Sequence, residues 1–371
     1  MITSISLNKT FLLLFVALEV LIVGVDGKCD GVCVPLNECA DDHFGGENWF
    51  DIRVGGDEEV EADCEQYLRV CCKNVIPPGT EGFTIRPTTG TNAGQEPKVF
   101  NDCGTRNMDG AGFRISHATQ GETEFGEFPW MVALYASGSY ICGGSLIKPN
   151  VVVTAGHCVF NKQNAGLVVR AGEWDSKTTD ELLAFQEQRV TRVIMHDQYN
   201  TKFLFNDIAL LVLEKPFQPD EHIQLLCLAP QGKSFDNEES CIATGWGKER
   251  FDSSSYQNIL KKVELPVMPH GDCQEAFRKT RLGPTFQLHR SMLCAGGEEG
   301  VDTCTGDGGS PLACPSVENG NRYQLAGIVA WGIGCGQAGV PGAYARASLY
   351  TTWIERNVEQ IMNDLNDYYG E

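Results

Sequence analysis

The 16 cysteines of this 371-residue chain constrain its fold more than any other feature of the sequence. An even and large number of cysteines favours disulfide bonds in an oxidising compartment over free thiols in the cytosol. Six of them lie between Cys29 and Cys72, and the next is Cys103. A segment as short as this first group buries too little apolar surface to fold alone. The spacing therefore predicts a small disulfide-rich unit followed by a larger domain.

The residues alone leave the pairing within the first group open, because six cysteines can pair in many ways. The group consists of Cys29, Cys33, Cys39, Cys64, Cys71 and Cys72. A zinc site is the competing explanation for clustered cysteines. It is disfavoured because the spacings are not those of zinc knuckles and the compartment is oxidising.

The N-terminus is typical of a secreted protein. Lys9 precedes an apolar run from Phe11 to Val25, and small residues lie near Gly24 to Gly27. This pattern predicts a secretory signal peptide over residues 1–27. A membrane anchor is the alternative, but it normally needs about 20 unbroken apolar residues, and Glu19 interrupts the run. We therefore expect a secreted, extracellular protein without a membrane span.

Charge and composition exclude several classes of protein. The chain holds 49 acidic and 29 basic residues, a formal net charge of −20. Binding to nucleic acid or to an anionic membrane needs clustered Lys and Arg, so neither partner is expected. Hydrophobic residues make up 42% of the chain, which supports packed cores rather than disorder.

Residues 74–102 have the composition of an extended, protease-accessible linker rich in Gly and Thr. Its prolines are Pro77, Pro78, Pro87 and Pro97. From Cys103 onward, short β-rich runs alternate with turns, which predicts an all-β barrel or sandwich domain. These runs are Met131–Tyr135, Val151–Thr154, Ile208–Leu213 and Gln324–Ala330.

One clear helix is expected at the C-terminus, where apolar residues recur at helical spacing and would dock on the domain. These residues are Trp353, Ile354, Val358, Ile361, Met362 and Leu365.

Four motifs follow one another in the larger domain. They are VVVTAGHCV with His157, FNDIALL with Asp207, SCIATGWGK and TCTGDGGSPLACP. In this order they resemble the trypsin/chymotrypsin-type serine proteases over residues 103–371. The resemblance implies two antiparallel β-barrels with the site between them. The disulfides that it implies are Cys103–Cys227, Cys142–Cys158, Cys241–Cys314, Cys273–Cys294 and Cys304–Cys335.

The first cysteine group lies in the runs CDGVCVPLNECA, WFDIRVG and DCEQYLRVCC. With its adjacent cysteines at 71 and 72, this segment resembles an arthropod clip domain, which we place over residues 28–73. The disulfides that this resemblance implies are Cys29–Cys71, Cys33–Cys64 and Cys39–Cys72. Together with the bonds of the larger domain, they would leave no free thiol.

The protease-like motifs lack a nucleophile. A serine hydroxyl attacks only when an adjacent histidine accepts its proton and a buried aspartate orients that histidine. His157 and Asp207 match the base and the orienting acid, but the family's Gly-Asp-Ser-Gly-Gly-Pro reads Gly-Asp-Gly-Gly-Ser-Pro over residues 306–311. Gly308 replaces the serine, so turnover should fall by about 10⁶-fold. We therefore predict an inactive protease homologue rather than an enzyme.

Rescue by Ser310 is not expected. This serine lies two positions beyond Gly308, so its Cα can be displaced by up to about 7 Å. A reacting group tolerates a misplacement of only about 1 Å before large losses in rate. His157 and Asp207 would then serve packing, through the hydrogen bond between them.

A recognition pocket is also implied by the protease resemblance. Asp302 matches the floor of a trypsin-like primary pocket, and Gly332 and Gly342 match the small residues that keep it open. A buried carboxylate there would favour an Arg or Lys side chain, whereas an exposed aspartate on a loop is the alternative. Gly306 and Gly308 would still offer backbone N–H groups to an oxyanion.

An acidic loop follows the AGEWD run. Some relatives hold calcium in this loop between acidic side chains and carbonyls. The acidic residues are Glu173, Asp175, Asp180 and Glu187. Acidic loops are common on so anionic a chain, so calcium is a candidate that we do not assign, and no cofactor is expected.

Activation by cleavage is the last implied property. In the family, a cut after Arg or Lys frees an isoleucine N-terminus, which pairs with the aspartate before the nucleophile. Arg114, Ile115 and Asp307 match these positions, although the residues after Ile115 are not the usual Val-Gly-Gly. Cleavage after Lys98 or Arg106 is the alternative.

A clip module, a linker and a protease-like domain with Gly308 in place of serine together resemble the clip-domain serine protease homologues of arthropod haemolymph. The resemblance implies a cleavage-activated, non-catalytic cofactor of prophenoloxidase activation in melanisation and innate immunity. Its partners would be prophenoloxidase or phenoloxidase and an upstream clip-domain protease, with its oligomeric state left open.

Two alternatives to this cofactor remain. A decoy or negative regulator would capture Arg-containing substrates, inhibitors or microbial surfaces through Asp302. An active serine endopeptidase would need another nucleophile and is the less favoured of the two.

Overall fold

The structure is a computed structural model in two compact units, which are treated separately. It describes residues 32–35, 69–72, 98–100, 102–111, 121–162, 166–178, 181–247, 257–300, 302–303, 307–316, 322–334 and 336–369. The first unit holds β1 (Val32–Pro35) and β2 (Arg69–Cys72), an antiparallel pair with Cys33 opposite Cys71. The signal peptide, most of the linker and the side chains of the clip cysteines lie outside the described residues.

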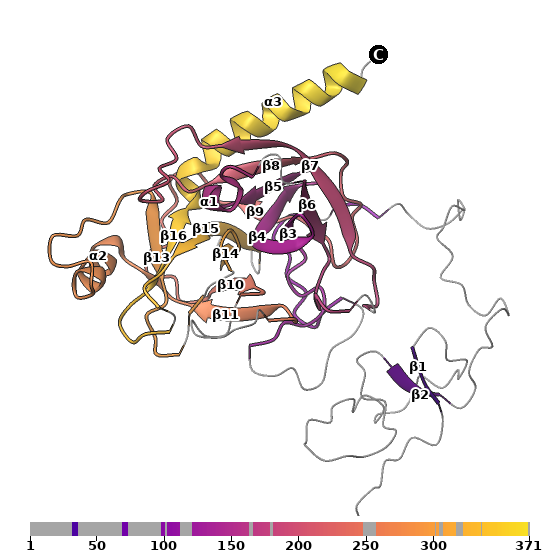
Figure 1. Ribbon diagram of the computed structural model, residues 1–371, viewed down its shortest axis with the longest axis horizontal. Coiled ribbons are helices and arrows are strands. Elements are labelled where there is room, and N and C mark those ends of the chain that lie inside the picture. Colours follow the sequence, from indigo (N-terminus) through magenta and orange to yellow (C-terminus); the bar gives the residue numbers. More distant parts are fainter. Residues whose placement is uncertain are drawn as a thin grey trace, which may run out of the picture. The chain divides into compact units, whose positions relative to one another are not determined.

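In the second unit, six antiparallel strands close into a barrel in the order β3-β4-β5-β8-β7-β6 (Figure 1). They are β3 (Met131–Ala136), β4 (Ser139–Lys148), β5 (Val151–Thr154), β6 (Leu167–Ala171), β7 (Gln186–Met195) and β8 (Ala209–Leu213). Every residue of β5 and β8 is buried. Both faces of these two strands are therefore covered, which explains their unbroken runs of Val and Leu.

The second sheet has the order β11-β10-β14-β15-β16-β13-β12, with β9 beside β15. Its strands are β9 (Cys227–Leu228), β10 (Cys241–Gly245), β11 (Lys261–Leu265), β12 (Val267–Met268), β13 (Met292–Ala295), β14 (Pro311–Pro315), β15 (Tyr323–Trp331) and β16 (Gly342–Arg346). Only Pro266 separates the two end strands β11 and β12, so the sheet curls into a half-barrel. Phe235, Leu312 and Tyr344 are part of the buried core of this sheet.

The expected double antiparallel β-barrel fold is confirmed, with one local departure. The short strand β9 runs parallel to β15, with Gln324 opposite Cys227. All other ladders between the described strands are antiparallel.

The helices differ in part from the expectation of a single C-terminal helix. The structure has α1 (Gly156–Val159), α2 (His270–Arg278), the 3-10 turn η3 (Ala347–Tyr350) and α3 (Thr351–Tyr369). The helix α2 was not predicted, and it buries Cys273 and Phe277. Within the described residues, none of the helices has the length and apolar composition of a membrane span.

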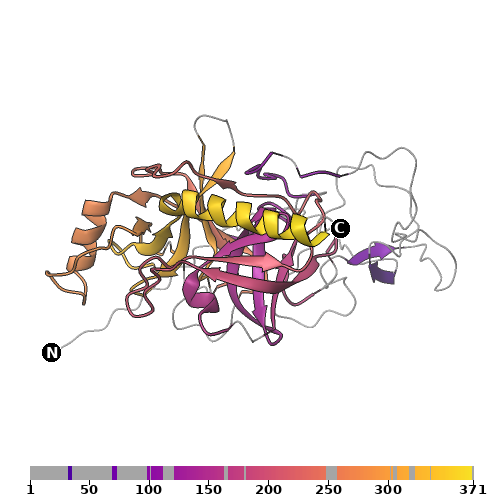
Figure 2. The ribbon, with the colours of Figure 1, turned by 90° about the horizontal axis from the view of Figure 1, so that it is seen from above.

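The C-terminal helix α3 runs along the outside of the domain (Figure 2). Ile354, Val358 and Ile361 are buried, as the helical spacing predicts. Met362 is 43% exposed, so its assignment to the docked face is wrong. An ion pair of 2.9 Å between Arg192 and Asp364 ties the outer half of α3 to β7.

Four disulfides join distant segments of the second unit. They are Cys103–Cys227, Cys142–Cys158, Cys241–Cys314 and Cys273–Cys294. Each is one of the pairs that the protease resemblance implies. Cys304 and Cys335 lie outside the described residues.

Candidate functional site

The pairing of β5 with β8 brings His157 next to Asp207. In this antiparallel pair Thr154 lies opposite Ala209, so the residues that follow β5 meet those that precede β8. The Nδ1 atom of His157 lies 2.7 Å from Asp207 Oδ2, and the His157 backbone N–H donates to Oδ1 at 2.8 Å. Asp207 is fully buried. These two hydrogen bonds orient the imidazole so that its Nε2 atom faces Gly308.

Gly308 occupies the place where the nucleophile of a serine protease would stand. A β carbon added to Gly308 would lie 2.7 Å from Nε2 of His157, closer than real atoms approach. The Gly308 carbonyl accepts a hydrogen bond of 2.9 Å from the N–H of Gly143 on β4, which holds this turn in position. The general base and its orienting acid are therefore assembled, but no hydroxyl can donate its proton to them from residue 308.

Ser310 does not supply the missing hydroxyl. Its side chain is fully buried, and its Oγ atom forms no hydrogen bond with any described residue. A β carbon on Gly143 would overlap this hydroxyl, and one on Gly245 would lie 3.3 Å from it. Ser310 thus fits beside two glycines, and it lacks the hydrogen bond to His157 that a nucleophile requires.

The turn before β14 keeps a tight backbone conformation. Gly309 has a φ of +79°, and a β carbon on it would overlap Thr154 and the carbonyl of Gly143. The carboxylate of Asp307 is almost fully buried and accepts a hydrogen bond of 2.8 Å from the Gly247 N–H. Ile115, its expected partner after cleavage, and the expected oxyanion donor Gly306 lie outside the described residues.

Comparison with known families decides the classification. The model of the trypsin family matches residues 119–354, and that of the serine protease clip domain PPAF-2 matches residues 24–73. The chain belongs to the clip-domain branch of the trypsin family.

The curated relatives of this clip-domain homologue include proteins named as inactive. It is 41% identical to "Inactive CLIP domain-containing serine protease A8" of Anopheles gambiae, over 90% of each chain. It is 47% identical to "Phenoloxidase-activating factor 2" of Galleria mellonella, over 69% of this chain and 88% of the relative. Together with Gly308, these relatives establish a catalytically inactive protease homologue.

In this homologue the half-buried Asp302 lies next to Gly342. Its Oδ1 accepts a hydrogen bond of 2.8 Å from the Thr303 N–H, and Oδ2 accepts one of 3.1 Å from the Gly336 N–H. A β carbon on Gly342 would lie 3.1 Å from Oδ1, so a larger residue there would crowd the carboxylate. Burial raises the pKa of Asp302 to about 6. A carboxylate in this setting gains from a cationic partner.

The structure also has an apolar groove that was not predicted. It has a volume of about 370 Å³, and Phe203, Phe205, Phe286, Leu288 and Trp331 contribute to its walls. Phe203 is 53% exposed. Trp331 is followed by Gly332. A β carbon added to Gly332 would have one neighbouring atom, the carbonyl oxygen of Gly334 at 3.4 Å, so a larger side chain would fit at this position. In the sequence, the one sign of this groove is a pair of phenylalanines two residues apart, at positions 203 and 205.

The acidic loop already holds a cationic side chain. Arg170 donates hydrogen bonds to Glu173 at 2.5 Å and to Glu187 at 2.8 Å. Burial beside Glu173 raises the pKa of Glu181 to about 7. The guanidinium of Arg170 thus compensates part of the negative charge of this loop. Asp180 lies outside the described residues.

A second group with metal-ligating side chains comprises Cys142, His157 and Cys158. The two sulfurs are joined in a disulfide. They therefore cannot act as thiolate ligands, and this group is not a metal site.

The candidate cleavage sites differ in accessibility. Arg106 donates hydrogen bonds to the buried carboxylate of Glu127, and its side chain is 12% exposed. Its guanidinium also lies 4.8 Å from the ring centre of Phe128. The Lys98 side chain is 61% exposed and pairs with Asp220 at 2.6 Å.

Proposed function

We propose that this clip-domain homologue is a secreted, non-catalytic cofactor of prophenoloxidase activation in haemolymph, serving melanisation and innate immunity. The observation that carries the proposal is a formed protease domain whose His157–Asp207 pair faces Gly308 instead of a nucleophile. Such a domain can still bind and orient partners. Two relatives are named phenoloxidase-activating factors, one in Galleria mellonella and one, 32% identical, in Holotrichia diomphalia.

In this proposal the protein acts as a scaffold. The clip domain and the protease-like domain bind prophenoloxidase or phenoloxidase, and an upstream clip-domain protease cleaves the scaffold. Cleavage exposes the binding surfaces and starts the assembly.

The bond cleaved is proposed to be Arg114–Ile115 or Lys98–Val99 rather than Arg106–Asn107. A protease must accept the arginine side chain in its own pocket, and Arg106 is held by Glu127. The disulfide Cys103–Cys227 lies between these bonds and distinguishes them. A cut after Arg114 leaves the clip domain attached through this disulfide, whereas a cut after Lys98 releases it.

Electrophoresis of the cleaved protein, with and without a reductant, shows whether the clip-domain fragment remains attached through this disulfide. Two fragments that separate only after reduction identify the cut after Arg114. Fragments that separate without reductant identify the cut after Lys98. Arg114→Gln and Lys98→Gln are the matched variants, and only the one at the cleaved bond should block cleavage.

Reconstitution tests the proposed function. Purified prophenoloxidase and its activating protease are mixed with the intact protein, the cleaved protein or the uncleavable variant, and diphenol oxidation is followed. We expect diphenol oxidation to rise in the mixture with the cleaved protein and not in the other two mixtures. No effect, or a fall in oxidation, would rule out the positive cofactor.

A decoy or negative regulator is the second candidate, favoured by the half-buried carboxylate of Asp302, which two backbone N–H groups hold in place. Such a protein would capture an Arg-containing segment without cutting it. In the same reconstitution, Asp302→Asn should abolish the effect of a decoy. It should leave unchanged the effect of a scaffold that acts through other surfaces.

A further inference from the structure

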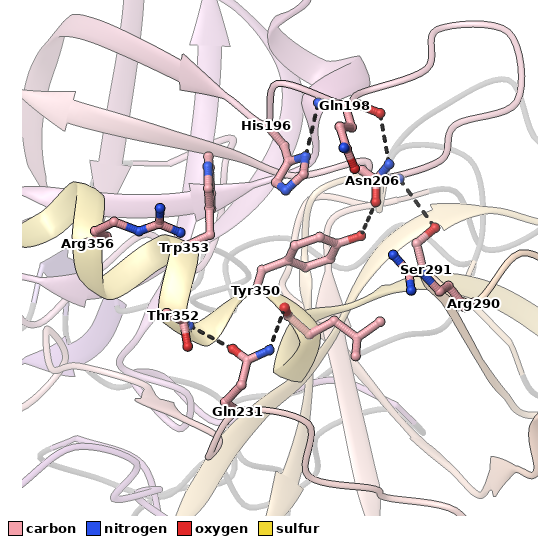
Figure 3. A pocket seen from close by; sticks show the side chains of 11 residues that line it. His196, Gln198, Asn206, Gln231, Arg290, Ser291, Tyr350, Thr352, Trp353 and Arg356 are labelled. Carbon is pink, nitrogen blue, oxygen red and sulfur yellow. Dashed lines mark hydrogen bonds between the residues drawn. The ribbon is translucent and has the colours of Figure 1, made fainter.

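A polar pocket lies where the end of β7, the segment before β13 and the start of α3 meet (Figure 3). Its volume is about 440 Å³, and its walls include His196, Arg290 and Arg356. No Asp or Glu lines it, although the chain has a net charge of −20. Its lining includes none of His157, Asp207 and Asp302.

The two arginines of this pocket are available to a ligand. Both are exposed, and among the described residues neither side chain forms an ion pair or a hydrogen bond. Figure 3 shows them on opposite sides of Tyr350. Five of the eight other arginines whose side chains the structure describes pair with carboxylates, namely Arg106, Arg170, Arg192, Arg278 and Arg322.

Hydrogen bonds between the wall residues fix the shape of the pocket. The Tyr350 hydroxyl donates to Asn206 Oδ1 at 3.0 Å, and the Asn206 N–H donates to Ser291 Oγ at 3.3 Å. The Gln231 amide donates to the Leu349 carbonyl and accepts from the Thr352 N–H, both at 2.8 Å. The walls are thus preorganised, which lowers the cost of binding.

An aromatic surface completes the pocket. The ring of His196 lies 5.2 Å from that of Trp353 and 5.1 Å from that of Tyr350, measured between centroids. Trp353 is half-buried, so it combines an apolar face with access to solvent. Such a face suits the apolar side of a sugar ring.

We propose that this pocket binds an anionic saccharide. Arg290 and Arg356 each offer a guanidinium to its sulfate or phosphate groups from opposite sides of the pocket, and its sugar ring lies against Trp353. The planar fork of a guanidinium matches the oxygens of a tetrahedral oxyanion and forms charge-assisted hydrogen bonds with them. Sulfate and phosphate share this chemistry, and the experiment separates them.

Calorimetric titration of the full protein tests the ligand class. The probes are a sulfated disaccharide, a phosphorylated disaccharide, the unsubstituted disaccharide, and inorganic sulfate and phosphate, all at physiological ionic strength. We expect at least one substituted sugar to bind about tenfold or more tightly than the unsubstituted one. The tighter of the two identifies the oxyanion. Equal binding of the unsubstituted sugar, or of the inorganic anion, would overturn the proposal.

Two matched double variants test the location. Arg290→Ala/Arg356→Ala should weaken binding of the preferred sugar about tenfold or more. Arg189→Ala/Arg281→Ala removes the same charge from exposed residues outside the pocket, and it should leave binding within about twofold of the unchanged protein. Equal losses in both variants, or no loss in the pocket variant, would overturn the site.

A third variant tests the role of the ring. Trp353→Leu keeps apolar bulk but removes the aromatic face. It should weaken binding of the substituted sugar and leave binding of the matching inorganic anion unchanged. Unchanged sugar binding in this variant would overturn the placement of the ring.

Discussion

The Nε2 atom of His157 lies 2.7 Å from the position that a β carbon on Gly308 would occupy. The imidazole therefore stands partly in the space that a serine side chain would need. The inactivity of this site thus has two physical origins: the hydroxyl is missing, and the retained base occupies part of its place. Restoring the serine alone would require His157 to move.

Gly308→Ala should lower the free energy of unfolding by about 1–3 kcal/mol, because the added methyl overlaps the His157 ring. Urea denaturation measures the change. The same substitution in a His157→Ala background should cost at least about 1 kcal/mol less. Equal costs in the two backgrounds would show that the ring does not limit the space at residue 308.

The buried carboxylate of Asp207 should be needed for stability although the protein does not catalyse. Asp207→Ala removes the acceptor of two donors, the backbone N–H and Nδ1 of His157. Leaving the buried N–H without a partner should cost about 1–3 kcal/mol. Asp197→Ala, a change at an exposed aspartate, is the control and should stay within about 0.5 kcal/mol. A negligible effect of Asp207→Ala on the unfolding midpoint would contradict this role.

The fold and the inactive site follow from the sequence for a physical reason. His157 directly follows β5 and Asp207 precedes β8, so the pairing of these strands determines that the two residues meet. Gly308 precedes β14 of the other sheet, and the hydrogen bond from the Gly143 N–H to its carbonyl holds it at this site. The predicted run Val151–Thr154 coincides with β5 because it consists of β-branched residues, three of them valines, and is buried on both faces.

The remaining features depend on contacts that no local pattern records. The sequence makes Arg106 a candidate cleavage site, but in the structure its guanidinium is hydrogen-bonded to Glu127. The pocket of Arg290 and Arg356 combines segments distant in sequence. The helix α2 is short and strongly polar, so it gives only a weak apolar periodicity.

Binding of a cationic probe to Asp302 should depend on pH. Burial raises the pKa of this carboxyl to about 6, so it is ionised above that pH and neutral below it. Affinity for benzamidine, a small amidinium ion, should fall about tenfold per pH unit below the pKa. Calorimetry between pH 5 and pH 8 measures the profile, and Asp302→Asn should bind weakly at every pH. A flat profile for the unchanged protein would contradict the prediction.

The same carboxyl should also make the stability of the protein depend on pH. Ionisation of Asp302 favours binding of a cation, but it lowers the free energy of unfolding. Its pKa is about 6 in the folded protein, against an ordinary value of 3.8 for an aspartate, so the folded state binds the proton more tightly. Its contribution therefore falls as pH rises from 3.8 to about 6. Over this range the stability of Asp302→Asn relative to the unchanged protein should rise with pH, as thermal unfolding would show. A constant difference would mean that the carboxyl is not desolvated.

Two arginine–carboxylate pairs near the start of the domain should differ in their effect on stability. Arg106 pairs with the fully buried carboxylate of Glu127, which Lys262 also contacts at 2.7 Å. Arg322 pairs with Asp102, whose side chain is 77% exposed. Arg106→Ala should cost about 2–4 kcal/mol, because it leaves a buried charge less well compensated and removes the stacking on Phe128. Arg322→Ala should cost less than about 1 kcal/mol. If Arg106→Ala were as mild as Arg322→Ala, the segment around Arg106 would be loosely held, and cleavage after Arg106 would become the favoured activation step.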